Sequence, residues 1–281
     1  MRRAALSTLT ACAMVLWGAA ATLADSPLKR LTLRHDLLGF EAVGRLDTEH
    51  GFCSGALIAP DLVLTAAHCL LNPETGARAA PDTIRFRAGL RDGTAIAERH
   101  GARAVMHPRY RHDDPDGLNQ LLSDVALIEL DAPIPSDLAS PFAQGEAPGA
   151  GGAVSVVSYA RGRSEAPSWQ RACAVVIKGQ GALVMTCDTH FGSSGAPVFD
   201  TSSGRPRIVS LISRGVREDG QSIVNGMAIG PALAETKAAL RAGRGVWPEP
   251  AVSARRVTVG GGALNRGSAQ NGGSGARFIR P

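Results

Sequence analysis

The sequence predicts an all-β fold in which short antiparallel strands form barrels or sandwiches. Short apolar runs recur along the chain between turn residues, and they fall into two successive groups. The 33 glycines and 17 prolines among 281 residues supply many turns. Aromatic residues make up only 4% of the chain, so the core must consist mainly of Val, Leu, Ile and Ala. Two similar subdomains are therefore expected.

The predicted elements follow in chain order. The first group of strands covers 42–46, 56–58, 62–64, 84–88, 102–106 and 125–130. A polar, proline-rich link near 132–152 precedes the second group, which covers 154–159, 172–177, 183–187, 196–199, 208–212 and 227–229. A short C-terminal helix is predicted over 231–240, because Pro231 stands near its first turn and Gly243 lies beyond its end.

Residues 1–24 have the pattern of an export signal. Arg2 and Arg3 give a positive start, residues 4–21 carry no charge, and residues 22–24 form a small-x-small cleavage site. A membrane anchor is the alternative, because the apolar run approaches the length of a span. Lipidation at Cys12 is a second alternative, although the apolar stretch continues past that cysteine.

The remaining chain divides into three parts. Residues 25–38 are polar and form a possible propeptide or N-terminal extension. Residues 39–245 hold the predicted strands and helix. Residues 246–281 are predicted to be a disordered tail rich in glycine and arginine.

The distribution of charge argues against a nucleic-acid partner. The net charge is +5, but residues 1–24 hold two arginines and residues 251–281 hold five, with no acid in either segment. The body between these ends is therefore slightly acidic, and the sequence shows no basic groove.

Four cysteines follow the predicted signal, and an even number in an exported chain indicates two disulfides. The strands around Cys173 and Cys187 flank a glycine-containing turn, and a hairpin centred on Gln180 places these two cysteines opposite each other. Cys53 then pairs with Cys69. A zinc site built from all four is the alternative, but no two of them have the close spacing of zinc ligands.

Three segments contain candidate catalytic residues. His68 ends an apolar strand beside Cys69, whose disulfide would fix the imidazole as a general base requires. Asp124 directly precedes an apolar run that can draw it beneath the surface, where it would orient a histidine. Ser194 lies in a glycine-containing turn, which can expose a nucleophilic hydroxyl and converging backbone amides.

These segments, Thr65-Ala66-Ala67-His68-Cys69, Asp124-Val125-Ala126-Leu127 and Gly192-Ser193-Ser194-Gly195-Ala196-Pro197, resemble the motifs of chymotrypsin-like serine peptidases in the family's chain order. The resemblance covers residues 39–243. It implies two antiparallel β-barrels with a catalytic triad in the cleft between them. An α/β-hydrolase is disfavoured, because its triad runs Ser, then acid, then His.

The resemblance also implies the roles of individual residues. Ser194 would attack a peptide carbonyl and form an acyl-enzyme, with His68 as the base and Asp124 orienting it. The amides of Gly192 and Ser194 would form the oxyanion hole. The substrate-binding residues would be Asp188, Thr189, His190, Ser213 and Gly215.

The sequence departs from trypsin-like zymogens at two places. Ser193 replaces the Asp that receives a new N-terminal ammonium after cleavage, and no Ile-Val-Gly-Gly start is present. In both respects the chain resembles the bacterial V8/glutamyl-endopeptidase branch. For specificity, the position of Asp188 slightly favours cleavage after Arg or Lys. Ile212 replaces the histidine with which that branch binds Glu, so the sequence gives poor support for acidic specificity. Thr189 and His190 would suit a small or polar residue.

The sequence thus predicts a secreted or periplasmic, monomeric serine endopeptidase that acts on proteins or peptides. No cofactor, metal, nucleic acid or stable membrane insertion after signal removal is expected. A catalytically silent homologue that serves as a binding module and an esterase are the alternative functions.

Overall fold

The computed structural model describes residues 25–218 and 221–249. The predicted export signal (1–24), and the predicted tail from residue 250 onward, lie outside the described residues. No helix of the described ranges is both long enough and apolar enough to cross a membrane.

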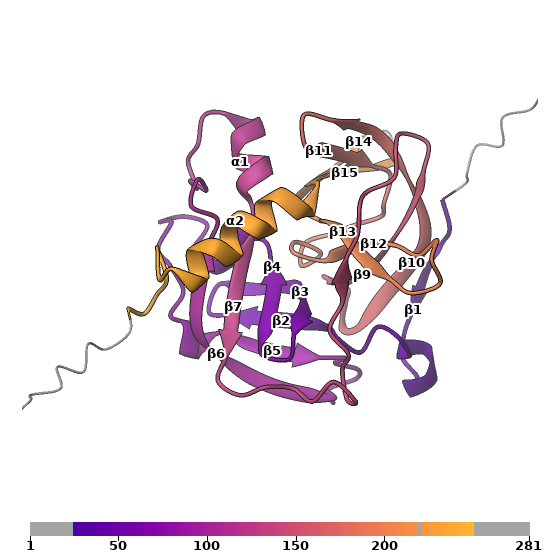
Figure 1. Ribbon diagram of the computed structural model, residues 1–281. Coiled ribbons are helices and arrows are strands. Elements are labelled where there is room, and N and C mark those ends of the chain that lie inside the picture. Colours follow the sequence, from indigo (N-terminus) through magenta and orange to yellow (C-terminus); the bar gives the residue numbers. More distant parts are fainter. Residues whose placement is uncertain (1–24, 219–220, 250–281) are drawn as a thin grey trace, which may run out of the picture. The chain divides into compact units, whose positions relative to one another are not determined.

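The first group of strands forms a closed barrel (Figure 1). The strand at residues 85–88 alternates between barrel interior and surface, as a half-buried strand does. Phe86 and Ala88 are buried, whereas Arg85 and Arg87, which alternate with them, are only partly buried. In barrel order the strands are β2 (Val43–Thr48), β3 (Gly51–Ala59), β4 (Leu62–Thr65), β7 (Ala126–Leu130), β6 (Ala97–Met106) and β5 (Arg85–Ala88).

The second group forms a curled half-barrel, so the predicted two-barrel architecture is confirmed, with the first barrel closed and the second open. Its order is β14-β15-β11-β10-β9-β12-β13-β8, with β1 also paired to β10. The bounds are β1 (Leu28–Arg30), β8 (Ala143–Gln144), β9 (Ala153–Ala160), β10 (Arg163–Gly179), β11 (Ala182–Met185), β12 (Pro197–Asp200), β13 (Arg207–Leu211), β14 (Arg214–Glu218) and β15 (Gln221–Met227).

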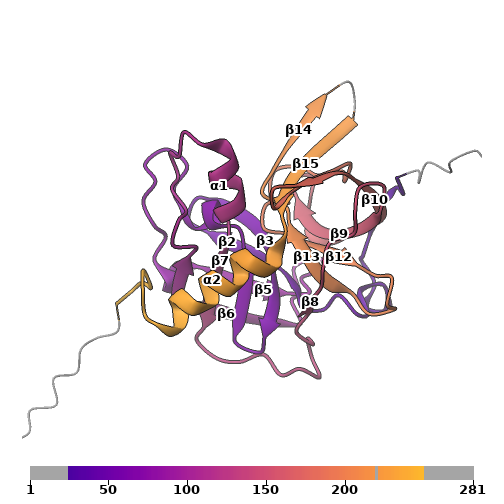
Figure 2. The same ribbon diagram turned by 45° about the horizontal axis from the view of Figure 1, so that its top comes forward.

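The curl nearly closes this sheet at one point. The amide of Ser213, just after β13, donates to Asn225 O on β15 at 3.0 Å. Gly226 allows this approach, because a Cβ there would lie 2.2 Å from Leu211 O. β13 instead pairs with the short parallel strand β8, so a full ladder does not form. The β14–β15 hairpin consequently projects from the sheet (Figure 2), and β14 remains an edge strand.

The hairpin that joins β10 to β11 confirms the predicted disulfide, with one difference in register. The turn consists of two residues, Gln180 and Gly181, and both have the positive φ (51° and 82°) that a tight hairpin turn requires. Near the turn, Gly179 faces Ala182, but a bulge between Val175 and Ile177 shifts the pairing by one residue. The shift brings the two cysteines, Cys173 and Cys187, together at a Cα–Cα distance of 5.0 Å.

Three helices of a single turn, η1 (Arg34–Leu37), η2 (Ala67–Leu70) and η3 (Pro81–Thr83), join the strands. The helix α1 (Gly117–Ser123) was not predicted from the sequence. Its start is fixed by Asp116, whose carboxylate accepts the amides of Leu118 and Asn119. Its seven residues are too few for a clear apolar period, which explains why it was missed. Asp124 follows its last residue.

The predicted C-terminal helix is present as α2 (Ile229–Arg241), which contacts β6, β7 and β13 (Figure 1). Its buried side chains include Leu233 and Thr236. Packing continues to Trp247, two residues past the predicted domain boundary: its backbone pairs with Ala104 and its indole donates to Ala79 O at 2.9 Å.

Residues 25–38, predicted as a propeptide or extension, are part of the packed structure. β1 pairs with β10, while Leu31 and Leu37 are completely buried in the main core. Removing this segment would take away a strand and two core side chains. Whether it is cleaved off remains a prediction.

The core has two parts. The larger fills the barrel and extends across the junction to Val157, Tyr159 and Phe199 of the second sheet. The smaller lies within the second sheet and includes the disulfide Cys173–Cys187. A continuous core across the junction holds the two halves, and the side chains between them, in a fixed relation.

Candidate active site

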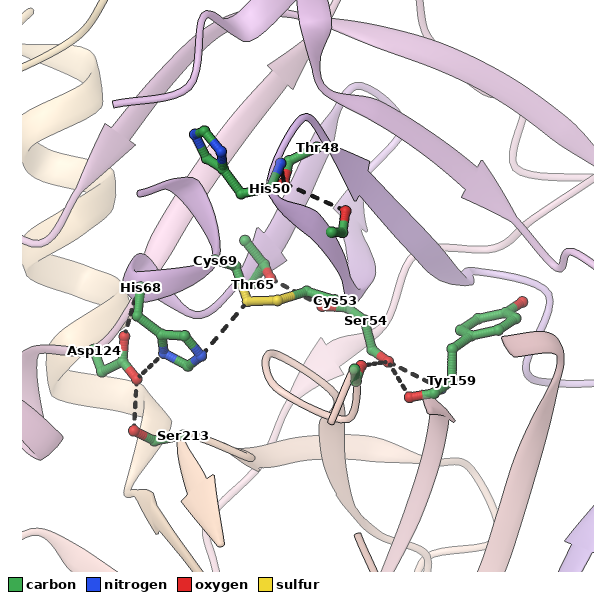
Figure 3. The surroundings of a disulfide bond; sticks show 12 residues. Thr48, His50, Cys53, Ser54, Thr65, His68, Cys69, Asp124, Tyr159 and Ser213 are labelled. Carbon is green, nitrogen blue, oxygen red and sulfur yellow. Dashed lines mark hydrogen bonds and ion pairs between the residues drawn. A yellow bond between two sulfur atoms is a disulfide. The ribbon is translucent and has the colours of Figure 1, made fainter. Parts of the chain in front are cut away.

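His68 and Asp124 form a hydrogen-bonded pair at the end of the barrel (Figure 3). The short helix η2 presents His68 after β4, and Asp124 stands between α1 and β7. His68 Nδ1 lies 2.8 Å from Asp124 Oδ2, and the His68 amide donates to Asp124 Oδ1 at 3.0 Å. One carboxylate therefore fixes both the backbone and the ring of His68, which leaves Nε2 for proton transfer.

A third group completes the environment of Asp124. The hydroxyl of Ser213 donates to Asp124 Oδ2 at 2.5 Å, and Asp124 is only 3% exposed. Burial raises the pKa of Asp124, but the charge of His68 and the hydrogen bonds from His68 and Ser213 outweigh burial, so the net direction is downward. Asp124 is thus an ionised, buried carboxylate with a fixed orientation.

The pKa of His68 moves the other way. Burial lowers it, while the charge of Asp124 and its hydrogen bond raise it, and the net direction is upward from the ordinary value. A histidine with a raised pKa is a stronger base. This is the property needed to take a proton from a hydroxyl.

The disulfide Cys53–Cys69 links this pair to the nucleophile candidate. Cys69 follows His68, and its sulfur lies 3.9 Å from His68 Nε2. On the other side of the bridge, the amide of Ser54 donates to Ser194 O at 2.8 Å. His68 and Ser194 are therefore connected by one disulfide and one hydrogen bond. Within the described residues, no hydrogen bond joins His68 Nε2 to the hydroxyl of Ser194.

The same sulfur atoms bear on the zinc alternative. Cys53, His68 and Cys69 bring potential ligand atoms within 4.8 Å of one another. Their sulfurs, however, are bonded to each other, and a disulfide supplies no thiolate for a metal. The other two cysteines are also paired. The four-cysteine zinc site is therefore wrong for this oxidation state.

The loop 190–195 that carries Ser194 has its carbonyl groups held from several sides. His190 O accepts the amide of Ser193 at 2.9 Å, and Phe191 O accepts that of Arg161 at 2.7 Å. Gly192 O accepts the hydroxyl of Ser54 at 2.9 Å. Further along, Ser193 O accepts the amide of Ala196 at 3.0 Å, and the Ser54 amide occupies Ser194 O. Five successive carbonyls thus have partners.

This arrangement leaves two amides available. In a trans peptide the N–H and C=O groups point in opposite directions. The Gly192 amide therefore points away from Arg161, and the Ser194 amide points away from Ala196. Across the described part of the chain, neither amide donates to a protein acceptor. They are the two groups that the sequence proposed for an oxyanion hole.

Gly192 is required here for two reasons, and its replacement gives a testable prediction. Its φ of +96° is unfavourable for other residues, and a Cβ would lie 2.2 Å from the ring of Phe52. We expect Gly192→Ala to displace its amide and lower kcat/KM by about 10²–10³-fold, as loss of one oxyanion donor does. Steady-state kinetics on a peptide substrate would measure the loss.

Gly204→Ala is the matched control. Gly204 also has a positive φ (+80°), but a Cβ there would meet nothing within 4 Å. The control should lose a little stability and keep its activity. Equal kinetics in Gly192→Ala and Gly204→Ala would contradict the assignment of the Gly192 amide.

A pocket of about 420 Å³ lies beside Ser194. It contains four of the five residues predicted to bind substrate, together with side chains that the sequence did not single out. Its lining is Thr189, His190, Phe191, Ser193, Ser194, Ile212, Ser213, Arg214, Gly215, Val216, Arg217 and Ser222. A second hollow contains His68 and Asp124 and shares Ser213 and Arg214 with the first. The pocket thus adjoins the His–Asp pair.

The fifth predicted residue, Asp188, lies elsewhere. It lines a neighbouring pocket that also contains Asp25 and Gln170, and its carboxylate pairs with Arg217 at 2.9 Å. The charge that would attract a basic side chain is therefore directed toward an arginine of the protein.

Sequence reasoning missed the groups that support the site. The Ser213 hydroxyl was expected only at a substrate-binding edge, and nothing local indicated its bond to Asp124, 89 positions away. Ser54, which holds both Gly192 O and Ser194 O, lies before the predicted strand 56–58 and was not singled out. The cations Arg214 and Arg217 belong to a segment that was not predicted as a strand.

A closed barrel and a curled sheet, with a His–carboxylate pair and a half-buried serine in a glycine-containing turn, define a protein of the chymotrypsin-like class. Comparison with known families agrees: residues 53–206 match the trypsin-like peptidase domain. The chain belongs to this family.

Individual relatives are more distant. The chain is 26% identical over 182 residues to glutamyl endopeptidase of Bacillus licheniformis, covering 64% of this chain and 55% of that protein. It is 28% identical over 161 residues to trypsin Blo t 3 of Blomia tropicalis, covering 54% of each. The chain thus spans about half the length of these curated relatives.

Solved structures show the same fold at low identity. A Glu endopeptidase in complex with MPD superposes with a TM-score of 0.61 at 18% identity, covering 78% of this chain and 98% of the other. The protease Anisep from Arthrobacter nicotinovorans has a TM-score of 0.57 at 18% identity, with coverages of 70% and 93%.

Proposed function

We propose that this protein is an exported serine endopeptidase that hydrolyses peptide bonds through an acyl-enzyme, with His68, Asp124 and Ser194 as its triad. The observation that supports the proposal most strongly is the buried carboxylate of Asp124. It accepts hydrogen bonds from the ring, the amide and the neighbouring serine at once. A merely structural histidine does not need three such constraints.

The proposed mechanism uses only groups described above. Ser194 Oγ attacks the substrate carbonyl carbon while His68 Nε2 takes its proton, and the carbonyl π electrons move to the oxygen. The amides of Gly192 and Ser194 stabilise that oxyanion. His68 then gives the proton to the leaving amine as the C–N bond breaks. Water hydrolyses the acyl-enzyme by the same route.

The substrate backbone has a natural binding surface. β14 is an edge strand of the second sheet, and it begins directly after Ser213 beside the pocket. An extended peptide can add to such an edge through main-chain hydrogen bonds. This arrangement favours a peptidase over an esterase, whose substrate has no backbone to pair.

Three measurements on the purified protein test the function. A fluorophosphonate should label one residue, Ser194, as peptide mass spectrometry would show. Peptide and activated-ester substrates should both be turned over. Labelling together with turnover of esters but not of peptides would support the esterase. Absence of both labelling and turnover would support the silent homologue.

We further propose an acidic P1 residue, in contrast to the basic one that Asp188 suggested. Arg214 and Arg217 line the pocket beside Ser194, and its described lining contains no carboxylate. The names of the two glutamyl endopeptidase relatives are consistent with this charge. We expect substrates ending in Glu to exceed matched Arg substrates in kcat/KM by at least about tenfold, or roughly 1.4 kcal/mol.

Two variants separate the possibilities. Arg217→Gln should reduce the Glu preference, while Asp188→Ser, which frees Arg217, should increase it. An Arg preference in the wild type that disappears in Asp188→Ser would restore the basic assignment. A panel with P1 Glu, Arg, Leu and Ala measures all outcomes.

Export is the setting in which the two disulfides are stable. We propose a secreted or periplasmic monomer that acts on protein substrates, with residues 1–24 as the cleaved signal. Mass spectrometry of the exported protein should find Asp25 as its first residue.

A further inference from the structure

A buried polar network lies behind the nucleophile and has no part in the mechanism above. Its centre is Ser193, which is 1% exposed. Arg163, at the start of β10, donates from Nη2 to Ser193 Oγ at 3.4 Å. Its other nitrogen, Nη1, donates to Ser158 O at 2.8 Å and to Ser158 Oγ at 3.1 Å. One guanidinium thus joins the β9–β10 hairpin to the loop before Ser194.

Ser193 transmits this contact to the turn that contains Gly192. Its hydroxyl donates to Ser158 Oγ at 3.3 Å and accepts the His190 amide at 3.3 Å. Its own amide donates to His190 O at 2.9 Å. The turn from His190 to Ser193 is therefore held through both side chain and main chain, and Gly192 lies inside it.

The charge of Arg163 is notable because it has no acidic partner close by. Among the described residues, no carboxylate lies within 4.0 Å of its guanidinium. Burial lowers the pKa of Arg163, while Asp188 acts in the opposite direction. A half-buried cation that bonds only to neutral oxygens costs free energy, and its three hydrogen bonds to Ser158 and Ser193 offset that cost.

Substrate binding does not account for the position of Arg163. Arg163 is absent from the lining of the pocket beside Ser194, whereas Ser193 is part of it. The N-terminal end of the described residues brings no positive charge to Ser193 either, because it lies at another pocket. Asp25 lines the neighbouring pocket, where its carboxylate accepts the hydroxyl of Thr186 at 2.7 Å.

We propose that Arg163 is a positioning residue that holds the oxyanion turn, residues 190–193, in its active conformation from within the chain. This role of Arg163 rests on the proposed function, in which the Gly192 amide belongs to an oxyanion hole. Since Arg163 is part of the folded domain, the turn is in place without a newly cleaved N-terminus.

The test uses Arg163→Met, which keeps the aliphatic stem and removes charge and donors, and Arg163→Lys. Arg171→Met is the control, because Arg171 lies on the same strand and its guanidinium stacks over Trp169 at 4.9 Å. We expect Arg163→Met to lower kcat by about 10- to 100-fold with KM changed less than about threefold, Arg163→Lys to be intermediate, and the control to match the wild type.

Two further measurements distinguish positioning from general stability. A peptide boronate should lose affinity for Arg163→Met in parallel with kcat, since it occupies the oxyanion hole. Ser193→Asp should keep part of the wild-type activity beside Arg163, with which it can form an ion pair. It should be inactive together with Arg163→Met, which leaves a buried carboxylate unpaired. Additive losses in this double-mutant cycle, or an unchanged kcat in Arg163→Met, would overturn the proposal.

Amide hydrogen exchange of residues 190–195 keeps the test independent of activity. Exchange there should become faster in Arg163→Met and stay unchanged in Arg171→Met. If the wild type hydrolyses nothing yet exchange responds in this way, the proposed function fails and the positioning by Arg163 stands. Unchanged exchange in Arg163→Met would contradict the positioning.

Discussion

Replacing Ser194 with Ala should lower kcat by about 10⁴–10⁶-fold while leaving a folded protein. The alanine lacks only the attacking oxygen. The backbone contact that places this residue, the Ser54 amide to its carbonyl, does not involve the side chain. Thermal unfolding should therefore occur near the wild-type temperature. Turnover of a peptide substrate, with active-site titration to exclude contaminating peptidase, measures the effect.

Ser193→Ala tests whether the nucleophile has been assigned to the correct serine. Ser193 is buried and bonded to Ser158, so its hydroxyl is not available for attack. We expect a loss of at most about tenfold, from weakened support of the oxyanion turn. Ser202→Ala, in the exposed turn after β12, should have no effect. Opposite phenotypes for Ser193 and Ser194 would show that the motif assignment is displaced by one residue.

The parts of the fold that follow from local pattern could be predicted from the sequence. The barrel strands correspond to short apolar runs between turn residues, and α2 has a proline near its start and a glycine after its end. The pairing of Cys173 with Cys187 followed from a hairpin with glycine in its turn. The bulge between Val175 and Ile177 was not predictable, because it is a property of how the two strands pair and leaves no mark in the local composition.

Parts of the site that depend on distant contacts could not be predicted. His68, Asp124 and Ser194 were recognisable because each lies in a distinctive local motif. Ser213 bonds to Asp124, 89 positions away, and Arg163 bonds to Ser193, 30 positions away. Such pairs form only when the folded chain brings distant segments together. Asp188 shows the reverse case: its position suggested a pocket residue, but Arg217 on a neighbouring hairpin pairs with it.

The second large effect should come from Asp124→Asn, which we expect to lower kcat/KM by about 10⁴-fold at neutral pH. An amide can donate a hydrogen bond to His68 Nδ1, which favours the tautomer with its proton on Nε2. That tautomer cannot accept the proton of Ser194. The neutral side chain also removes the charge that opposes the effect of burial on His68.

The pH dependence of kcat/KM distinguishes this loss of activity from simple unfolding. In the wild type the pKa of His68 lies above its ordinary 6.5, so kcat/KM should fall as pH drops through a value above 6.5, where the imidazole becomes protonated and stops acting as a base. In Asp124→Asn, burial acts without the carboxylate, so the residual activity should persist to lower pH. Ser213→Ala keeps the charge and should give a much smaller loss with little shift of this limb. An acid limb at the same pH in Asp124→Asn and the wild type would show that the titrating base is not His68.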